Sequence, residues 1–303
     1  MSFLIAMITG IVLPVQTSIN SKFRFKVDSP YLASAIAMVT GMLFMLIVGL
    51  VARQPLGLGP HFWFHNPWWL FLGGVTGAIA YTIKIVLLPH LGAVQTVTMP
   101  ILGLIIMSML IDNFGWFNLP VNRFNLIRFI GILALLAGVM LVVYRKKKKS
   151  KDEESLLPWQ ILGILAGLAL AIQTSSNGAL GRAAHSTVQA GVFSFASGSV
   201  LMVLAVGIFQ RNLHHVVKAT GRGSRWWIWL GGPLGAIYAF SSLSLAPIMG
   251  AGTTIVLTIL GNIAGSLVID KFGLLGVARR HVGIKQYSGL IVMIIGIALV
   301  KLF

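Results

Sequence analysis

Apolar segments of helix length follow one another along nearly the whole chain, with short polar segments between them. The hydrocarbon core of a bilayer needs about 20 apolar residues per helix. On that measure, ten segments qualify as membrane spans. We expect them at about 3–20, 31–52, 68–88, 91–111, 126–144, 159–177, 188–209, 226–246, 250–269 and 286–302.

One long polar run interrupts this pattern near the middle of the chain. It covers residues 145–155, and six of its residues are lysine or arginine. Such a cluster is typical of the cytoplasmic side of a membrane, where anionic headgroups attract it. We therefore predict a cytoplasmic linker at 145–157, between a first helical unit at 1–144 and a second at 158–303.

The two units repeat one another. Gln-Thr-Ser-Ile-Asn at 16–20 returns as Gln-Thr-Ser-Ser-Asn at 173–177, and the Gly-Gly-x-x-Gly-Ala motif at 73–78 returns at 231–236. Ile-Asp-Asn-Phe-Gly at 111–115 returns as Ile-Asp-Lys-Phe-Gly at 269–273. The offset changes only from 157 to 158 residues along the whole unit. This order predicts a duplication.

Each unit has five predicted spans, an odd number, so the two copies should face opposite ways across the membrane. Loop charge agrees: with the linker inside, the inner segments 21–30, 145–155, 210–225 and 271–285 hold 17 of the 23 lysines and arginines. That bias follows the positive-inside rule. We predict an all-α transmembrane bundle of two inverted five-helix repeats, with both termini outside.

Composition supports the membrane class and narrows the chemistry. The chain is 57% apolar and 10% charged, whereas a soluble domain has about 25% charged residues. The net charge of +17 lies in loops, a distribution that suits anionic lipid headgroups and not a nucleic acid. There is no cysteine, and the chain has no catalytic, metal-binding or nucleotide-binding motif. We expect no enzyme activity, no metal and no cofactor.

Polar residues inside the spans are the candidates for function, because polar groups are costly in lipid. Gln16 and Asn20 are four residues apart, as are Gln173 and Asn177, so each pair shares one helix face. They either bond neighbouring helices together or line a pathway and contact substrate. Because the repeats are inverted, the two pairs would serve opposite ends of that pathway.

Asp112 and Asp270 lie near the ends of predicted spans, where the helix dipole disfavours a carboxylate. Something must compensate each charge. Arg123 or Arg128 could pair with Asp112, and Lys271 or Arg279 with Asp270. Each aspartate is either a structural ion pair or a group that couples or gates transport.

Three further residues are candidates for substrate contact. Lys84 is the one cation more than two residues from the end of a predicted span, and it either extends to the headgroups or faces the interior and favours an anionic or polar substrate. Tyr81 and Tyr238 occupy near-equivalent places in the repeat. They are either packed aromatics or contacts for substrate.

Several of these motifs together resemble a known family. They are Pro-x-Gln-x-x-x-Asn at 14–20, Gly-Gly-x-x-Gly-Ala-x-Tyr at 231–238, and Gly-Asn-x-x-x-Ser-Leu-x-Ile-Asp-x-Phe-Gly at 261–273. The chain resembles a fused, two-copy member of the YdcZ-type family in the drug/metabolite transporter superfamily. That resemblance implies a ten-helix bundle and secondary transport, and it adds Asn262 as a substrate-contact candidate. Leu104 stands at the equivalent position of the first copy.

The sequence therefore favours a secondary transporter of the bacterial plasma membrane. It would move a small molecule or metabolite, with export as the expected direction, by alternating access between its halves. The alternative is a non-transporting membrane subunit or scaffold. The expected partners are the substrate, a bilayer with anionic headgroups, and, if the bundle dimerises, a second copy of the chain.

Overall fold

The protein is described by a computed structural model covering residues 2–143, 155–210, 213–220, 225–249, 251–280 and 283–302. These residues form helices and loops, with no strand among them. The α-helices are α1 (Ser2–Val27), α2 (Pro30–Val51), α3 (Pro60–His65), α4 (Leu72–Phe114), α5 (Leu126–Val143), α6 (Leu157–Ala183), α7 (Thr187–Ala205), α8 (Gly231–Met249), α9 (Ala251–Phe272) and α10 (Ile284–Leu302). Short helical turns connect several of them: η1 (Trp68–Phe71), η2 (Trp116–Asn118), η3 (Val206–Gln210), η4 (Leu213–Ala219), η5 (Trp226–Leu230) and η6 (Leu274–Gly276).

Six of the described helical segments are long and apolar enough to cross a membrane: Ser2–Val27, Pro30–Val51, Trp68–Phe114, Leu157–Ala183, Thr187–Gln210 and Thr253–Phe272. Two shorter apolar helices, Leu126–Val142 and Ile284–Val300, accompany them. A count of ten membrane crossings stays a prediction. The run at 145–154 lies outside the described residues.

The first helix of each repeat is longer than expected. α1 continues to Val27 and α6 to Ala183, so most of the predicted loop at 21–30 is helical. A tight turn then starts the next helix, because Ser29 and Ser186 cap it: the Ser29 Oγ accepts from the Leu32 amide at 3.0 Å, and the Ser186 Oγ from the Gln189 amide at 3.2 Å. The two caps occupy equivalent places in the repeat.

Helix α4 joins two segments that we predicted as separate spans. It covers 43 residues but is broken at Gly92, which has φ 78° and ψ 173°. A residue with a Cβ rarely adopts that conformation, so glycine is required there. The break gives the first repeat two helix halves, 72–91 and 93–114, which correspond to α8 and α9 of the second repeat.

Equivalent helices of the two repeats run in opposite directions. In the α2–α7 pair, Gly41 lies against Phe195 and Gly49 against Val188, so residue numbers rise along one helix while they fall along the other. In the α5–α10 pair, Gly131 lies against Gly296 and Gly138 against Gly289. This antiparallel packing of equivalents is the geometry of an inverted repeat.

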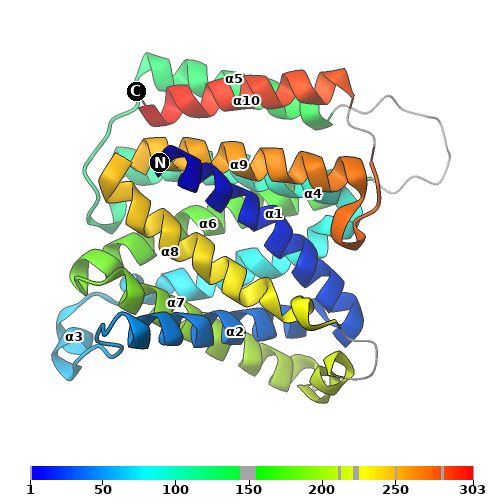
Figure 1. Cartoon of the computed structure of the whole chain (residues 1–303). Helices are drawn as coiled ribbons and strands as arrows, with labels where there is room; N and C mark the ends of the chain where they lie inside the picture. The colour runs from blue at the N-terminus through cyan, green and yellow to red at the C-terminus, as the bar shows by residue number, and fades with distance from the viewer. Residues whose placement is uncertain are drawn as a thin grey trace.

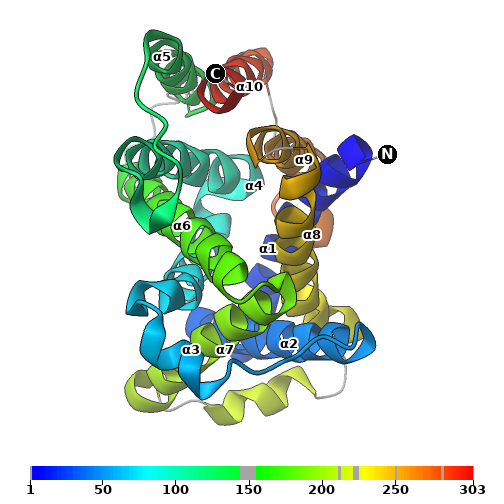
Figure 2. The ribbon, with the colours of Figure 1, turned by 90° about the vertical axis from the view of Figure 1, so that its left-hand side faces the viewer.

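The helices are arranged in layers (Figure 1). The α5–α10 pair lies over α4 and α9, and α2 and α7 cross at the opposite side of the bundle. Figure 2 shows α4 and α6 on one side of the molecule and α1, α8 and α9 on the other. The N-terminal end of α1 and the C-terminal end of α10 lie at the same end of the bundle, on the left in Figure 1.

Candidate substrate pathway

The repeated glutamines and asparagines pack against the repeated glycines of the opposite repeat. On one side, Gln16 and Asn20 of α1 lie directly on Gly235 and Gly231 of α8. On the other, Gln173 and Asn177 of α6 lie directly on Gly77 and Gly73 of α4. A Cβ at any of these glycines would collide with the facing amide. The two sequence motifs therefore form one pseudo-symmetric contact at the seam between the repeats.

A tyrosine closes only one of these two contacts. The side-chain amides of Gln16 and Asn20 both donate to the Tyr81 hydroxyl. That hydroxyl in turn donates to the Gly231 carbonyl oxygen at 3.4 Å. Tyr81 thus links α4 to α1 and α8. At the other contact, the Asn177 Nδ2 donates to the Ser194 Oγ at 2.9 Å.

The contact closed by Tyr81 is also the less exposed of the two. Gln16 and Asn20 are only 2% and 1% exposed, whereas Gln173 and Asn177 are partly exposed. The neighbouring threonines differ more: Thr17 is 5% exposed, and Thr174 is exposed. Thr174 is two helical turns from Gly167, which packs on Pro100 of α4, so it lies on an inward-facing side of α6. The seam is therefore buried near α1 and more exposed near α6.

Three amide oxygens at this seam have no hydrogen-bond partner. They are the Oε1 of Gln16, the Oδ1 of Asn177 and the Oδ1 of Asn262. Asn262 is 8% exposed, and its backbone packs on Gly10 of α1. Buried polar atoms in proteins are normally hydrogen-bonded. Unpaired acceptors on three different helices suit a place where a polar ligand or water bonds.

Tyr238 is not the structural counterpart of Tyr81. Its hydroxyl faces the hydroxyls of Ser242 and Thr258 on α8 and α9, away from the Gln173 pair. The reason is the offset, which is 158 residues in this part of the repeat and makes Ala239 the equivalent of Tyr81. A shift of one residue turns a side chain by about 100° around a helix.

Lys84 is buried, with 7% of its surface exposed. On α4, the helical position of Lys84 lies between two sides: Gly77 and Leu87 touch α6, and Tyr81 touches α1. It therefore points toward the seam between the repeats and not outward to the headgroups. No acidic residue pairs with it among the described residues.

Asp270 and Arg280 hold the break in α4. The Asp270 carboxylate accepts from the Ala93 amide at 2.8 Å and the Val94 amide at 2.9 Å, so it caps the second half of α4. The Arg280 guanidinium donates to the Leu91 carbonyl at 2.9 Å and the His90 carbonyl at 3.2 Å, so it caps the first half. The charge of the Asp270 carboxylate is thus compensated by a helix N-terminus, and this contact joins the two repeats.

The first repeat keeps part of this arrangement. The Asn122 amide donates to the Asp112 carbonyl at 2.8 Å, as the Arg280 amide donates to the Asp270 carbonyl at 2.9 Å. Asn122 stands where Arg280 stands in the second repeat, so the guanidinium has no equivalent. Arg128, which we expected as a possible partner of Asp112, is 3% exposed in α5 and donates to the Asn122 carbonyl at 3.1 Å.

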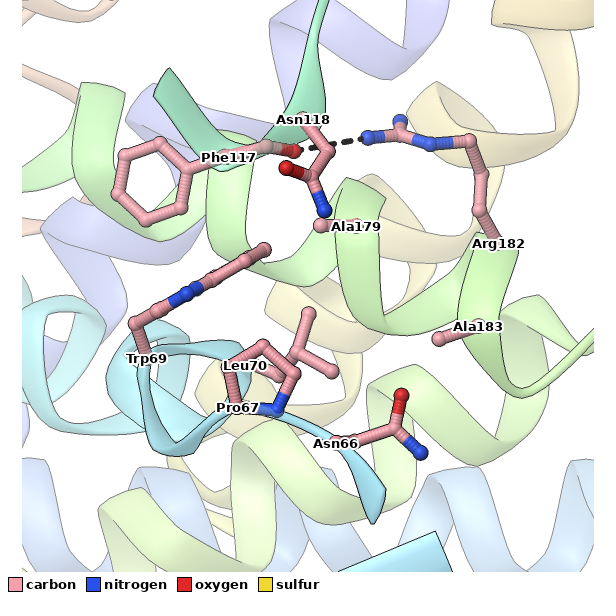
Figure 3. A pocket seen from close by; sticks show the side chains of 9 residues that line it. All are labelled: Asn66, Pro67, Trp69, Leu70, Phe117, Asn118, Ala179, Arg182 and Ala183. Carbon is pink, nitrogen blue, oxygen red and sulfur yellow. Dashed lines mark hydrogen bonds between the residues drawn. The ribbon is translucent and has the colours of Figure 1, made fainter.

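A separate pocket opens at the C-terminal end of α6 (Figure 3). Its volume is about 280 Å³. The lining comes from residues 66–67, η1, η2 and α6: Asn66, Pro67, Trp69, Leu70, Phe117, Asn118, Ala179, Arg182 and Ala183. The guanidinium of Arg182 donates to the Phe117 carbonyl at 3.3 Å. Sequence reasoning missed this pocket because its residues come from three separate segments of the chain and carry no repeated polar motif.

Comparison with known families decides the identity. A family model described as "Putative inner membrane exporter, YdcZ" matches residues 1–141 and again residues 158–299. The chain belongs to the YdcZ family of the drug/metabolite transporter superfamily. The double match confirms both the resemblance and the all-α membrane fold. As a YdcZ protein, the chain is a multi-pass protein of the inner membrane with a transporter role, which also suggests that it is not an enzyme.

Comparison with other proteins adds only the fold. A solved structure titled "Crystal structure of protein" is 15% identical, covers 98% of this chain and 96% of its own, and has a TM-score of 0.60. At that identity the likeness concerns architecture alone. No curated protein matches the sequence.

Proposed function

We propose that this YdcZ protein exports a small polar molecule by alternating access at the seam between its repeats. The observation that carries the proposal is the unequal state of two equivalent contacts. Gln16 and Asn20 are sealed under Tyr81, while Gln173 and Asn177 are partly exposed. In an inverted repeat, exchange of these two local states converts a bundle open at one end into one open at the other.

Substrate contacts in this proposal come from both repeats. The unpaired oxygens of Gln16, Asn177 and Asn262 accept hydrogen bonds, and Lys84 supplies a positive charge. A buried cation without an acidic partner favours a substrate with an anionic or strongly electron-rich group. The substrate is therefore a small molecule that carries hydrogen-bond donors together with such a group.

The break in α4 is the proposed hinge. Asp270 and Arg280 of the second repeat bond the two helix halves of the first, on either side of Gly92. Each half can then tilt while its end stays capped. Asp270 gates transport in this proposal through backbone contacts, and Asp112 has the matching place in the first repeat.

The orientation proposed is linker inside and both termini outside. The basic segments around Lys22, Lys218 and Arg225 gather at the C-terminal end of α1, where η4 and η5 contact that helix. The opposite end, with the α6 pocket, has fewer cations. The sealed contact then lies toward the cytoplasm and the open one toward the outside.

Single cysteines test this proposal, because the chain has none of its own. Thr17→Cys and Thr174→Cys are equivalent positions on α1 and α6. An impermeant maleimide should label position 174 rapidly from outside intact cells. It should label position 17 slowly, and only in inverted vesicles. Equal labelling of both positions from the same side would contradict alternating access at this seam.

A further inference from the structure

The α6 pocket has an internal counterpart at the other end of the molecule. Trp69 corresponds to Trp227, Asn118 to Gly276, and Ala179 to Lys22. The backbone is the same in both places: Phe117 and Asn118 have φ 61° and 54°, and Leu275 and Gly276 have φ 55° and 79°. The same cradle of helix end, tryptophan and left-handed turn is therefore built twice.

In the counterpart, a lysine fills the cradle. The Lys22 Nζ lies 5.2 Å from the centre of the Trp227 ring, a cation–π contact. A Cβ on Gly276 would lie 3.4 Å from the Cδ and Nζ of Lys22. The alkyl-ammonium side chain therefore lies between the tryptophan and the turn.

In the α6 pocket, the lysine is replaced by Ala179, and the space remains. Figure 3 shows the Trp69 ring and the Asn118 side chain both directed toward Ala179. Phe117 packs edge-on against Trp69, with centroids 5.4 Å apart, which holds the ring in place. The volume of about 280 Å³ is many times the roughly 10–15 Å³ needed to hold one water, so a small solute fits.

Arg182 adds an anion-binding group to this pocket. Its place in the first repeat is taken by Phe25, so the charge is new to this copy. It uses one donor on the Phe117 carbonyl, whereas a guanidinium has five. No carboxylate pairs with it among the described residues. A cation alone would be repelled by Arg182, so the ligand must also carry a negative group.

We propose that the α6 pocket binds a small zwitterion, with its primary ammonium over Trp69 where Lys22 lies on Trp227, and its anionic group on Arg182. Ethanolamine phosphate has this chemistry. It occurs as the headgroup of a phospholipid and as a free solute. The tryptophans of this region sit at a predicted membrane interface, so both sources can reach the pocket.

Ala179→Lys is the decisive variant, because it rebuilds the filled cradle of the first repeat. The purified full-length protein is titrated with O-phosphoethanolamine, ethanolamine and inorganic phosphate, and the midpoint of thermal unfolding is measured. Wild type should bind O-phosphoethanolamine most tightly, and Ala179→Lys should not bind it. Ala184→Lys adds the same charge to the same helix end outside the pocket and should bind like wild type.

Two further variants test the proposal even if Ala179→Lys fails to fold. Arg182→Gln should reduce the affinity for O-phosphoethanolamine to that for ethanolamine. Trp69→Leu should weaken both by about tenfold, the range of a desolvated cation–π contact. Unchanged binding in either variant would overturn the assignment.

A second arm separates the two sources. The same variants are reconstituted in nanodiscs of phosphatidylethanolamine or of phosphatidylglycerol alone. A stabilisation specific to phosphatidylethanolamine that Ala179→Lys abolishes identifies the lipid headgroup, and binding of the free solute in both bilayers identifies a soluble ligand. If wild type responds to neither, the pocket does not bind this zwitterion and the proposal fails. Alternating access at the seam is unaffected by that result.

Discussion

Replacement of Asp270 by alanine should be among the most destabilising single changes in this protein. The carboxylate is 2% exposed and accepts from the amides of Ala93 and Val94. Alanine would leave two buried amides without a partner, at about 1–3 kcal/mol each. The loss of a negative charge at a helix N-terminus adds about 0.5 kcal/mol. Together, the free energy of unfolding should fall by roughly 2.5–6.5 kcal/mol.

Thermal unfolding in detergent measures this change. At about 2 °C per kcal/mol, the lower end of the range for long chains, the midpoint should drop by roughly 5–13 °C. Asp270→Asn should lie between alanine and wild type, because its one side-chain oxygen can still accept from an amide. Asp28→Asn is the matched control, because Asp28 is an exposed aspartate whose side chain is 58% accessible and asparagine tolerates its φ of 55°. If Asp270→Ala and Asp28→Asn unfold at the same temperature, the carboxylate does not hold the break in α4.

Four other outcomes follow from the same structure. Gly92→Ala should prevent folding or lower the midpoint by more than Asp270→Ala, because φ is 78° and the new Cβ would lie 2.6 Å from the Arg280 Cδ; Gly57→Ala, with nothing within 4 Å, should have no effect. Gly77→Ala should cost about 1–3 kcal/mol by overpacking, and a double-mutant cycle with Gln173→Ala should recover most of that loss; additive effects would mean that the two residues do not touch. Tyr81→Phe should increase maleimide labelling of a cysteine at position 17, since it removes the hydroxyl that seals Gln16 and Asn20; unchanged labelling would exclude Tyr81 as the seal. The Lys218 ammonium, 2.7 Å away, lowers the pKa of Asp28 below its ordinary value of 3.8, so the pair stabilises the fold above that pH and the stabilisation is lost as pH falls through the lowered pKa. Asp28→Asn should therefore unfold at a slightly lower temperature than wild type at neutral pH and at the same temperature in strong acid. A constant difference at all pH values would contradict this.

Much of the architecture could be predicted from the sequence because membrane insertion depends on local properties. The length of each apolar segment, the odd number of spans per unit and the loop charges together predicted inverted repeats. The antiparallel contacts of Gly41 with Phe195 and Gly131 with Gly296 agree with that prediction. The sequence also singled out Gln16, Asn20, Gln173 and Asn177, because polar side chains within a membrane span are costly and often functional.

Three features were decided by the tertiary structure alone. Tyr81 and not Tyr238 joins the amide cluster, because a one-residue shift in the repeat turns the second tyrosine away. Asp270 caps a helix half 176 residues earlier in the chain, at Val94, and no local pattern encodes such a partner. The pocket at Ala179 is open because alanine leaves the space that its counterpart Lys22 fills in the first repeat. Sequence periodicity reports which face of a helix is buried, but the helix that covers that face is set by packing between segments far apart in the chain.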